Sequence, residues 1–228
     1  MTDSIISNLY YGVYSFEVGG LVVTGNEVSA STVYGIDPHT SSHDMTITKN
    51  VVHDNGKHGI ILAEDCVDSV ISDNVVYANG QHGIVLYQRS DRNVVERNES
   101  FRNGSQGINV NESSGNAIRD NKVYDNTESG IAVAQSSQDN MLERNDVRSN
   151  QQDGVRLVSR SGGTTVRDNV IGQNVRYGVY LDVTDPFTLS GNTIFRSRYG
   201  ISTSGTADVP AGENTLFGNT DGDVREPK

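Results

Sequence analysis

Apolar and polar positions along the chain repeat at intervals of 22 to 24 residues. The clearest mark of each repeat is a glycine followed directly by isoleucine or valine. These glycines are Gly12, Gly35, Gly59, Gly83, Gly107, Gly130, Gly154, Gly178 and Gly200. Self-similarity at a fixed spacing of roughly 20 to 50 residues is typical of solenoids, in which each repeat is one structural unit. The pattern therefore predicts about nine stacked units.

Within each repeat the apolar residues fall into four columns. The first column is the residue directly after the glycine, and the second is two places further on. The other two columns lie three places before and two places after a recurring asparagine. This alternation of β-branched apolar and polar residues predicts three short strands in each repeat. The recurring asparagines are Asn26, Asn50, Asn74, Asn98, Asn121, Asn145, Asn169, Asn192 and Asn214, and a second set is Asn55, Asn79, Asn103, Asn126, Asn150, Asn174 and Asn219. We expect these columns to form hydrogen-bonded ladders and the asparagines and glycines to occupy left-handed turn positions.

These elements predict an all-β fold, a parallel β-helix whose coils lie about 4.8 Å apart. One repeat cannot bury its own apolar face, but stacking closes a continuous core. We expect one domain over residues 1–228, with regular coils over about 8–205 and a degenerate last coil and tail over 206–228. Because no capping segment precedes Asn8, the first coil should expose strand edges that favour end-to-end self-association.

The composition excludes several classes of protein. Hydrophobic residues make up 34% of the chain, and its 24 glycines disfavour a helical bundle. No apolar stretch approaches the ~20 residues of a membrane span, and the first residues lack the apolar core of a secretion signal. The single cysteine, Cys66, excludes an internal disulfide and a cysteine-based metal cluster. The net charge of −11 argues against nucleic acid as a partner.

The repeat is broken at Pro38, which stands where other coils carry an apolar residue. Proline removes a hydrogen-bond donor from a strand, so it indicates an edge strand or a bulge. A phenol, a carboxyl group and an imidazole stand close to it in the sequence. Stacking of the coils predicts one face, across three adjacent coils, that holds Tyr34, Asp37, His39, His58, Glu64 and His82.

Such a face suits the removal of a proton next to a carboxylate. This reaction needs a base on one side of the carbon, an acid on the other, and a group that neutralises the carboxylate. His39 and Tyr34 could supply the two proton transfers, and His58, Lys57 or a protonated acid could meet the carboxylate. A surface stack of side chains with no catalytic role would give the same pattern.

At these residues the chain resembles the mannuronan C-5-epimerases, right-handed parallel β-helix enzymes that act on alginate. Tyr-Gly-Ile-Asp-Pro-His at 34–39 is similar to the catalytic motif of that family. Segments 8–12 and 57–61 resemble its periplasmic, calcium-independent branch, whereas 67–69 and 77–79 resemble its secreted, calcium-dependent branch. The resemblance covers roughly residues 8–185 and implies a right-handed β-helix.

The resemblance also implies roles for individual residues. His39 and Tyr34 would be the proton-transfer pair on opposite faces of C5, and Asp37 would orient His39 or bind substrate. Glu64 would take the role of an aspartate of the secreted branch, with Asp65 as the other candidate because of a one-residue offset. The periplasmic branch carries an arginine at this place that neutralises the uronate. The residues expected to bind substrate here are Lys57, His58, His82, Asp65, Arg89 and Arg156.

Three functions remain open from the sequence. The first is C5-epimerisation of D-mannuronate to L-guluronate in alginate, the second is cleavage of a polyuronate by β-elimination, and the third is a non-catalytic carbohydrate-binding β-helix. An anionic polysaccharide is the expected partner, and an extracellular or periplasmic location follows from that substrate. We expect no required cofactor and no metal ligands. A calcium ion could nevertheless offset residues 1–88, which hold ten acidic and two basic side chains.

Overall fold

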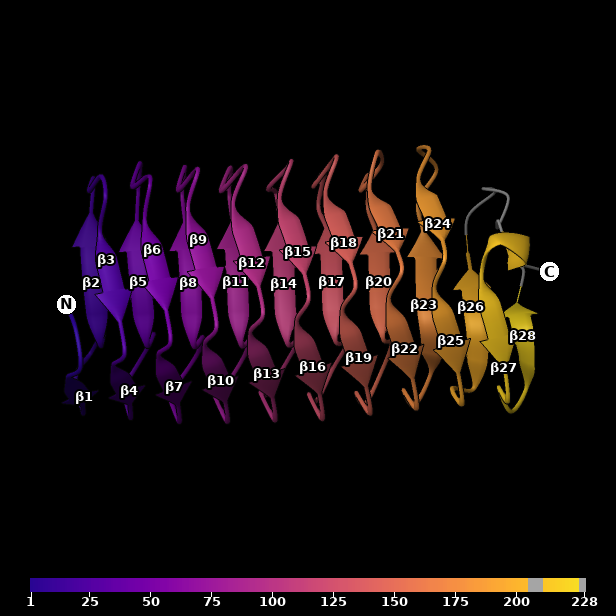
Figure 1. Cartoon of the computed structure of the whole chain (residues 1–228), viewed down its shortest axis with the longest axis horizontal. Helices are drawn as coiled ribbons and strands as arrows, with labels where there is room; N and C mark the ends of the chain where they lie inside the picture. The colour runs from indigo at the N-terminus through magenta and orange to yellow at the C-terminus, as the bar shows by residue number, and fades with distance from the viewer. Residues whose placement is uncertain (205–210, 226–228) are drawn as a thin grey trace.

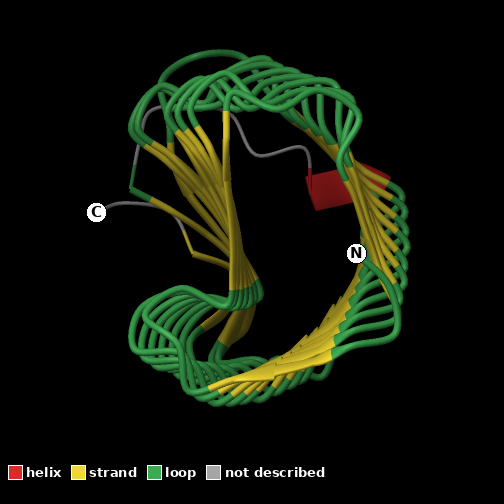
Figure 2. Cartoon of the chain, turned by 90° about the vertical axis from the view of Figure 1, so that its left-hand side faces the viewer, coloured by secondary structure: helices red, strands yellow, loops and turns green. Residues whose placement is uncertain are grey.

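The computed structural model describes residues 1–204 and 211–225. Within them the chain winds into a stack of similar coils, with its N-terminus at one end (Figure 1). Each regular coil contributes one strand to each of three parallel sheets, which we name the β1, β2 and β3 sheets after their first members. Seen along the stack, strands lie over strands and turns over turns (Figure 2). The predicted all-β parallel solenoid of about nine coils is confirmed.

The β1 and β3 sheets consist of short strands. The β1 sheet contains β1 (Ile5–Ser7), β4 (Glu27–Ser29), β7 (Val51–His53), β10 (Val75–Tyr77), β13 (Glu99–Phe101), β16 (Lys122–Tyr124), β19 (Asp146–Arg148), β22 (Val170–Gly172), β25 (Thr193–Phe195) and β27 (Thr215–Phe217). The β3 sheet contains β3 (Val22–Thr24), β6 (Thr46–Thr48), β9 (Val70–Ser72), β12 (Val94–Glu96), β15 (Ala117–Arg119), β18 (Met141–Glu143), β21 (Thr165–Arg167) and β24 (Thr188–Ser190). A single 3-10 turn, η1 (Ala211–Glu213), is the helical element of the described residues.

The β2 sheet has the longer strands and carries the residues singled out from the sequence. It contains β2 (Val13–Phe16), β5 (Ile36–His39), β8 (Ile60–Ala63), β11 (Ile84–Tyr87), β14 (Ile108–Asn111), β17 (Ile131–Ala134), β20 (Val155–Val158), β23 (Tyr177–Asp182), β26 (Tyr199–Thr203) and β28 (Gly222–Arg225). Pairing extends to β1 before residue 8 and to β27 and β28 after residue 205. Residues 205–210 of the expected last coil lie outside the described residues.

The predicted apolar columns form the core. Ile36, Ile60, Ile84 and Ile108 follow one another in register across the β2 sheet, and all are fully buried. The columns that flank the asparagines are buried in the same way, except that Leu216 in the last coil is partly exposed. Each coil therefore closes a slice of one continuous hydrophobic core, as repeat proteins require.

The predicted asparagine ladders are confirmed, except that the second one ends at Asn174, because the side-chain amide of Asn219 donates to Asp223 instead. In the first, the side-chain amide of each asparagine donates to Oδ1 of the asparagine in the next coil, for example from Asn50 to Asn74 at 3.0 Å. The second ladder repeats this from Asn55 to Asn79 at 2.9 Å. The side chains are buried, so these bonds satisfy polar groups that would otherwise be costly to remove from water.

The expectation that asparagines and glycines take left-handed turn positions was wrong for the ladder asparagines and the repeat glycines, but it holds for Gly25, Gly115, Gly191 and Gly218. The left-handed residue directly precedes the ladder asparagine, as at Lys49 and Asp73, both with φ of 56°. None of the nine repeat glycines, all within the described ranges, has a positive φ. Glycine is needed for close stacking instead, because a Cβ at Gly35 would lie 2.5 Å from Cγ1 of Val52 and 2.6 Å from the carbonyl oxygen of Gly59.

The expectation that Pro38 marks an edge or a bulge was also wrong. The strand β5 lies inside the β2 sheet, between β2 and β8. Its register with β8 pairs Ile36 with Ile60 and His39 with Ala63, so both pairs are 24 residues apart and no residue is inserted. Because proline lacks an N–H group, the strand forgoes one ladder bond at this point.

In the described part of the chain, no helix combines the length and the apolar character needed to cross a membrane.

Candidate active site

A stack of aromatic rings lies on the outer face of the β2 sheet, at the position before each of the first four repeat glycines. The Tyr34 ring stacks on His58 with centroids 5.0 Å apart, and His58 stacks on His82 at 4.9 Å. Tyr11 continues the stack at 5.7 Å from Tyr34. Beside the stack runs a groove of about 280 Å³. It is lined by Tyr34, His58, Ile61, His82, Val85, Tyr87, Asn109 and Asn111.

The two stacked histidines are neutral at physiological pH. Burial lowers the pKa of His58 to about 3, with further lowering by His82 and Lys57, and burial lowers the pKa of His82 to about 4. The Nδ1 atom of His58 accepts the backbone N–H of His82 at 3.4 Å, which places the ring proton on Nε2. These rings can donate a hydrogen bond to a ligand, but they cannot offer it a positive charge.

Asp37 is a buried carboxyl group without a hydrogen-bond partner on Oδ1 among the described residues. Only 1% of the residue is exposed. Burial, and then the charge of Glu64, raise the pKa of Asp37 to about 7. Burial, together with Asp37, also raises the pKa of Tyr34. Near neutral pH the Tyr34 phenol therefore keeps its proton, and a large share of Asp37 is the protonated acid.

His39 is held by a short chain of hydrogen bonds that crosses to the next coil. Its Nδ1 atom lies 2.8 Å from the Thr40 hydroxyl, which in turn donates to Oε2 of Glu64 at 3.1 Å. A hydroxyl that donates to Glu64 accepts from His39, so the proton of the neutral imidazole lies on Nδ1. The lone pair of Nε2 is then free to act as a base. Glu64 is 3.8 Å from Nδ1 of His39.

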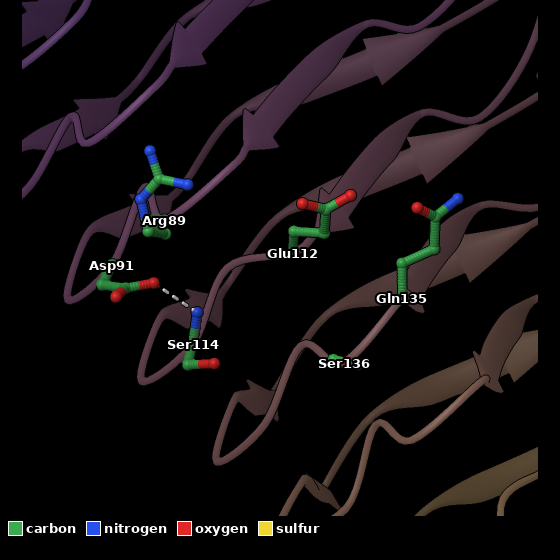
Figure 3. A pocket seen from close by; sticks show the side chains of 6 residues that line it. All are labelled: Arg89, Asp91, Glu112, Ser114, Gln135 and Ser136. Atoms are coloured by element: carbon green, nitrogen blue, oxygen red, sulfur yellow. Dashed lines mark hydrogen bonds between the residues drawn. The ribbon is translucent and has the colours of Figure 1, made fainter.

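Asp65 and Arg89 are not brought to this groove. They form a two-pronged ion pair at 2.7 and 2.8 Å, which lowers the pKa of Asp65. Arg89 lines a different pocket of about 500 Å³ at the turns that follow β11, β14 and β17 (Figure 3). There it lies near Asp91 and Glu112, and Asp91 accepts the backbone N–H of Ser114 at 2.6 Å. The neighbouring residues Glu64 and Asp65 thus have different partners: Glu64 accepts from Thr40, and Asp65 pairs with Arg89.

Lys57 is the cation that the structure places beside the phenol. Its Nζ atom lies 5.9 Å from the centroid of the Tyr34 ring, and the side chain is exposed. Arg156, the other cation considered from the sequence, lies on β20, four strands beyond β8 in the same sheet.

Several groove residues were missed in the sequence. Tyr87, Asn109 and Asn111 line the groove, and Thr40 connects His39 to Glu64. The sheet register supplies the missing signal, because Asn109 is aligned with Val85, and Asn111 with Tyr87. Counting every column from the glycine would have shown two asparagines on the outer face in the same coil.

A family model described as right handed beta helix region matches residues 61–220, which is more than half of the chain. The chain belongs to the right-handed β-helix family. The match sets the hand of the solenoid, which was predicted to be right-handed. A second model, described as periplasmic copper-binding protein (NosD), matches residues 1–100 of this right-handed β-helix. Among the described residues, no group of three or more His, Cys, Asp or Glu side chains is placed to hold a metal ion.

The resemblance of this right-handed β-helix to mannuronan C5-epimerases is confirmed. Over 55 residues it is 47% identical to the mannuronan C5-epimerase of Pseudomonas aeruginosa and 44% identical to that of Pseudomonas fluorescens. Each match covers 24% of this chain and 10% of the relative.

Solved structures extend the likeness to nearly the whole chain. The periplasmic alginate epimerase AlgG is similar over 99% of this right-handed β-helix, with a TM-score of 0.74 and 26% identity. The A-module of the Azotobacter vinelandii mannuronan C-5 epimerase AlgE4 is similar over 92%, with a TM-score of 0.77 and 27% identity. The chain spans 50% of the first of these structures and 62% of the second.

Proposed function

We propose that the protein is a mannuronan C5-epimerase, which converts D-mannuronate to L-guluronate within polymeric alginate. The observation that carries the proposal is the set of side chains on β5 and just before it in the sequence. An imidazole with a free Nε2, a protonated phenol and a buried carboxyl group without a partner lie on one outer face, at His39, Tyr34 and Asp37. These are the three groups that epimerisation next to a carboxylate requires.

The proposed reaction begins with His39. Its Nε2 takes the proton from C5, and the electrons of the broken C–H bond pass into the substrate carboxylate. A hydrogen bond from protonated Asp37 to that carboxylate offsets the negative charge that develops on it. This explains how a site without an arginine in its groove can still accept a uronate.

Tyr34 then completes the inversion. Because its raised pKa keeps the phenol protonated, Tyr34 acts as the acid and delivers its proton to C5 from the opposite face. Lys57, 5.9 Å from the ring, stabilises the phenolate that remains. Solvent then restores the proton of Tyr34 and removes that of His39.

The proposal extends to the setting of the protein. An anionic polysaccharide is the substrate, and a periplasmic or extracellular location fits both that polymer and the periplasmic name of one structural relative. No cofactor is needed in the steps above, since Asp37 takes the charge-neutralising role. We therefore expect a calcium chelator to leave turnover unchanged. End-to-end self-association stays a prediction.

The test is incubation of the protein with polymannuronate, followed by proton NMR. New guluronate signals support the proposal, and their loss in His39→Ala and Tyr34→Phe ties the activity to this site. His43→Ala is the matched control, because that histidine lies at an exposed turn and pairs with Asp44 instead. Absorbance of an unsaturated uronate would identify a lyase, and an unchanged polymer would identify a binding module. Either of these results would overturn the proposal.

A further inference from the structure

A second cluster of charged and aromatic side chains lies on the same outer face of the β2 sheet. Arg156 on β20 is the register partner of Tyr180 on β23, and Tyr177 on β23 is the partner of Tyr199 on β26. Asp153 precedes the glycine of its coil, as Tyr34 does in its own. The cluster therefore begins in line with the candidate site, five coils away, which is about 24 Å at about 4.8 Å per coil.

Three arginines of this cluster have their guanidinium groups over tyrosine rings. Arg156 lies 4.6 Å from the centroid of the Tyr180 ring, and Arg176 lies 5.0 Å from that of Tyr177. Arg225 lies 5.8 Å from the same Tyr177 ring and donates to its hydroxyl group. Stacking of this kind fixes the plane of a guanidinium group and leaves N–H groups at its edge for a carboxylate.

The arginines are only partly neutralised. Asp153 is fully buried and is shared by Arg156 at 3.1 Å and Arg176 at 3.8 Å. Arg198 pairs with Asp221 at 2.6 Å. Among the described residues Arg225 forms no ion pair, so the four arginines share two carboxylate partners, Asp153 and Asp221. Around the candidate site the balance is reversed, because Glu64 and the ionised share of Asp37 together outweigh Lys57.

A line of unpaired polar atoms connects the two places. Gln106 Oε1, Asn111 Oδ1 and Ser129 Oγ are buried, and within the described ranges they have no hydrogen-bond partner. All three lie on or beside β14 and β17, between the groove and the arginines. Buried polar atoms in proteins are normally hydrogen-bonded. The outer face of the sheet therefore carries polar side chains all the way from the groove to the arginines.

We propose that Arg156, Arg176 and Arg225, held against Tyr177 and Tyr180, form a second subsite that binds carboxylates of the same polyuronate chain. The inference takes from the proposed function only the class of ligand, a polyuronate, and does not depend on the reaction. A chain bound at this end is presented to His39 at a high effective concentration, which compensates for the acidic surroundings of the catalytic groups.

The test is the affinity of the full chain for polymannuronate, measured by calorimetry on catalytically inactive His39→Ala protein. Adding Arg225→Gln should weaken binding about tenfold, because a guanidinium that meets a carboxylate is removed. Asp153→Asn should strengthen binding, since it frees two arginines at nearly constant volume. Arg196→Gln is the matched control, because this exposed arginine follows β25 of the β1 sheet and should not change the affinity.

Folding and function are separated by two further readouts. Circular dichroism and thermal unfolding of Arg225→Gln should match the parent, since Arg225 is an exposed residue on the last strand of the sheet. Equal affinities of Arg225→Gln and Arg196→Gln would overturn the subsite, even if the protein epimerises alginate. Weakened binding in Arg225→Gln alone would support the subsite, even if no turnover of the polymer is found.

Discussion

The hydroxyl oxygen of Thr40 lies 2.8 Å from Nδ1 of His39. The same hydroxyl donates to Glu64 in the next coil at 3.1 Å, so Thr40 bridges the Glu64 carboxylate and the His39 imidazole. This arrangement decides which nitrogen of His39 is free to act as the base. It depends on the coil register, because Thr40 and Glu64 stand 24 residues apart.

Thr40→Val should lower kcat about tenfold, or about 1.4 kcal/mol in the activation barrier. Valine has nearly the same shape but cannot accept from His39, so the imidazole loses the bond that sets its tautomer. Steady-state kinetics on polymannuronate measure the effect. Thr40→Ser should restore most of the rate, and equal losses in both variants would show that the hydroxyl is not the cause.

Glu64→Gln and Asp65→Asn should behave differently although each removes one negative charge. Glu64→Gln should lower turnover about tenfold, because the positive charge that forms on His39 loses its nearest carboxylate. Asp65→Asn removes an exposed ion pair to Arg89, worth roughly 0–1 kcal/mol, and should leave turnover unchanged. Similar losses in the two variants would contradict the assignment of Glu64.

The pH dependence of activity should follow Asp37. Its pKa is raised to about 7, and the proposed mechanism uses the protonated form, so activity should fall as the pH rises above about 7. Glu64 contributes to that raised pKa, so Glu64→Gln should move the alkaline fall to lower pH. In Asp37→Asn the fall should disappear, since an amide donates a hydrogen bond at every pH. Rate profiles of the three proteins provide the measurement.

Asp37 should also link stability to pH. Because the pKa of the folded state is raised above the ordinary value of 3.8, the folded protein binds the proton more tightly than the unfolded chain. The contribution of Asp37 to the free energy of unfolding should therefore be greatest below about pH 4. It should fall between about pH 4 and pH 7, by at most about 4 kcal/mol. Urea unfolding of the parent and Asp37→Asn at several pH values isolates this contribution, which the variant should lack.

The repeat glycines give a prediction about the fold. A Cβ at Gly59 would lie 2.4 Å from Cγ1 of Val76 and 2.8 Å from the carbonyl oxygen of Gly83. Gly59→Ala should thus force two coils apart and cost roughly 1–3 kcal/mol. Gly212→Ala is the control, because no atom lies within 4 Å of a Cβ there. Thermal unfolding that shows equal effects for both would refute the close-stacking explanation.

Much of the fold could be predicted because one spacing governs every coil. Once Gly35 and Gly59 are aligned, the core columns and the stacked Tyr34 and His58 follow from counting residues. The left-handed residues could be found in this way only in part, because the same turn position holds Asp73, whose type favours it, and Lys49, whose type does not. A third ladder from Asn116 to Asn140 also escaped, since it spans few coils.

The candidate site was predictable in some of its residues but not in its chemistry. The pattern placed His39, Tyr34 and Asp37 on one face, but the neutral state of His58 follows from burial that only the packed structure shows. The sequence alone favoured Glu64 but left Asp65 as the other candidate. The side chain of Arg89 distinguishes them, because it binds Asp65 and leaves Glu64 to Thr40.

The central claim is that His39 removes the C5 proton and Tyr34 returns one from the opposite face. Incorporation of deuterium from heavy water at C5 of polymannuronate, followed by NMR, tests it most directly. Tyr34→Phe should introduce deuterium into mannuronate without forming guluronate, because His39 can still exchange the proton on its own face, whereas His39→Ala should do neither. Deuterium at C5 in His39→Ala, or guluronate formed by Tyr34→Phe, would contradict the account.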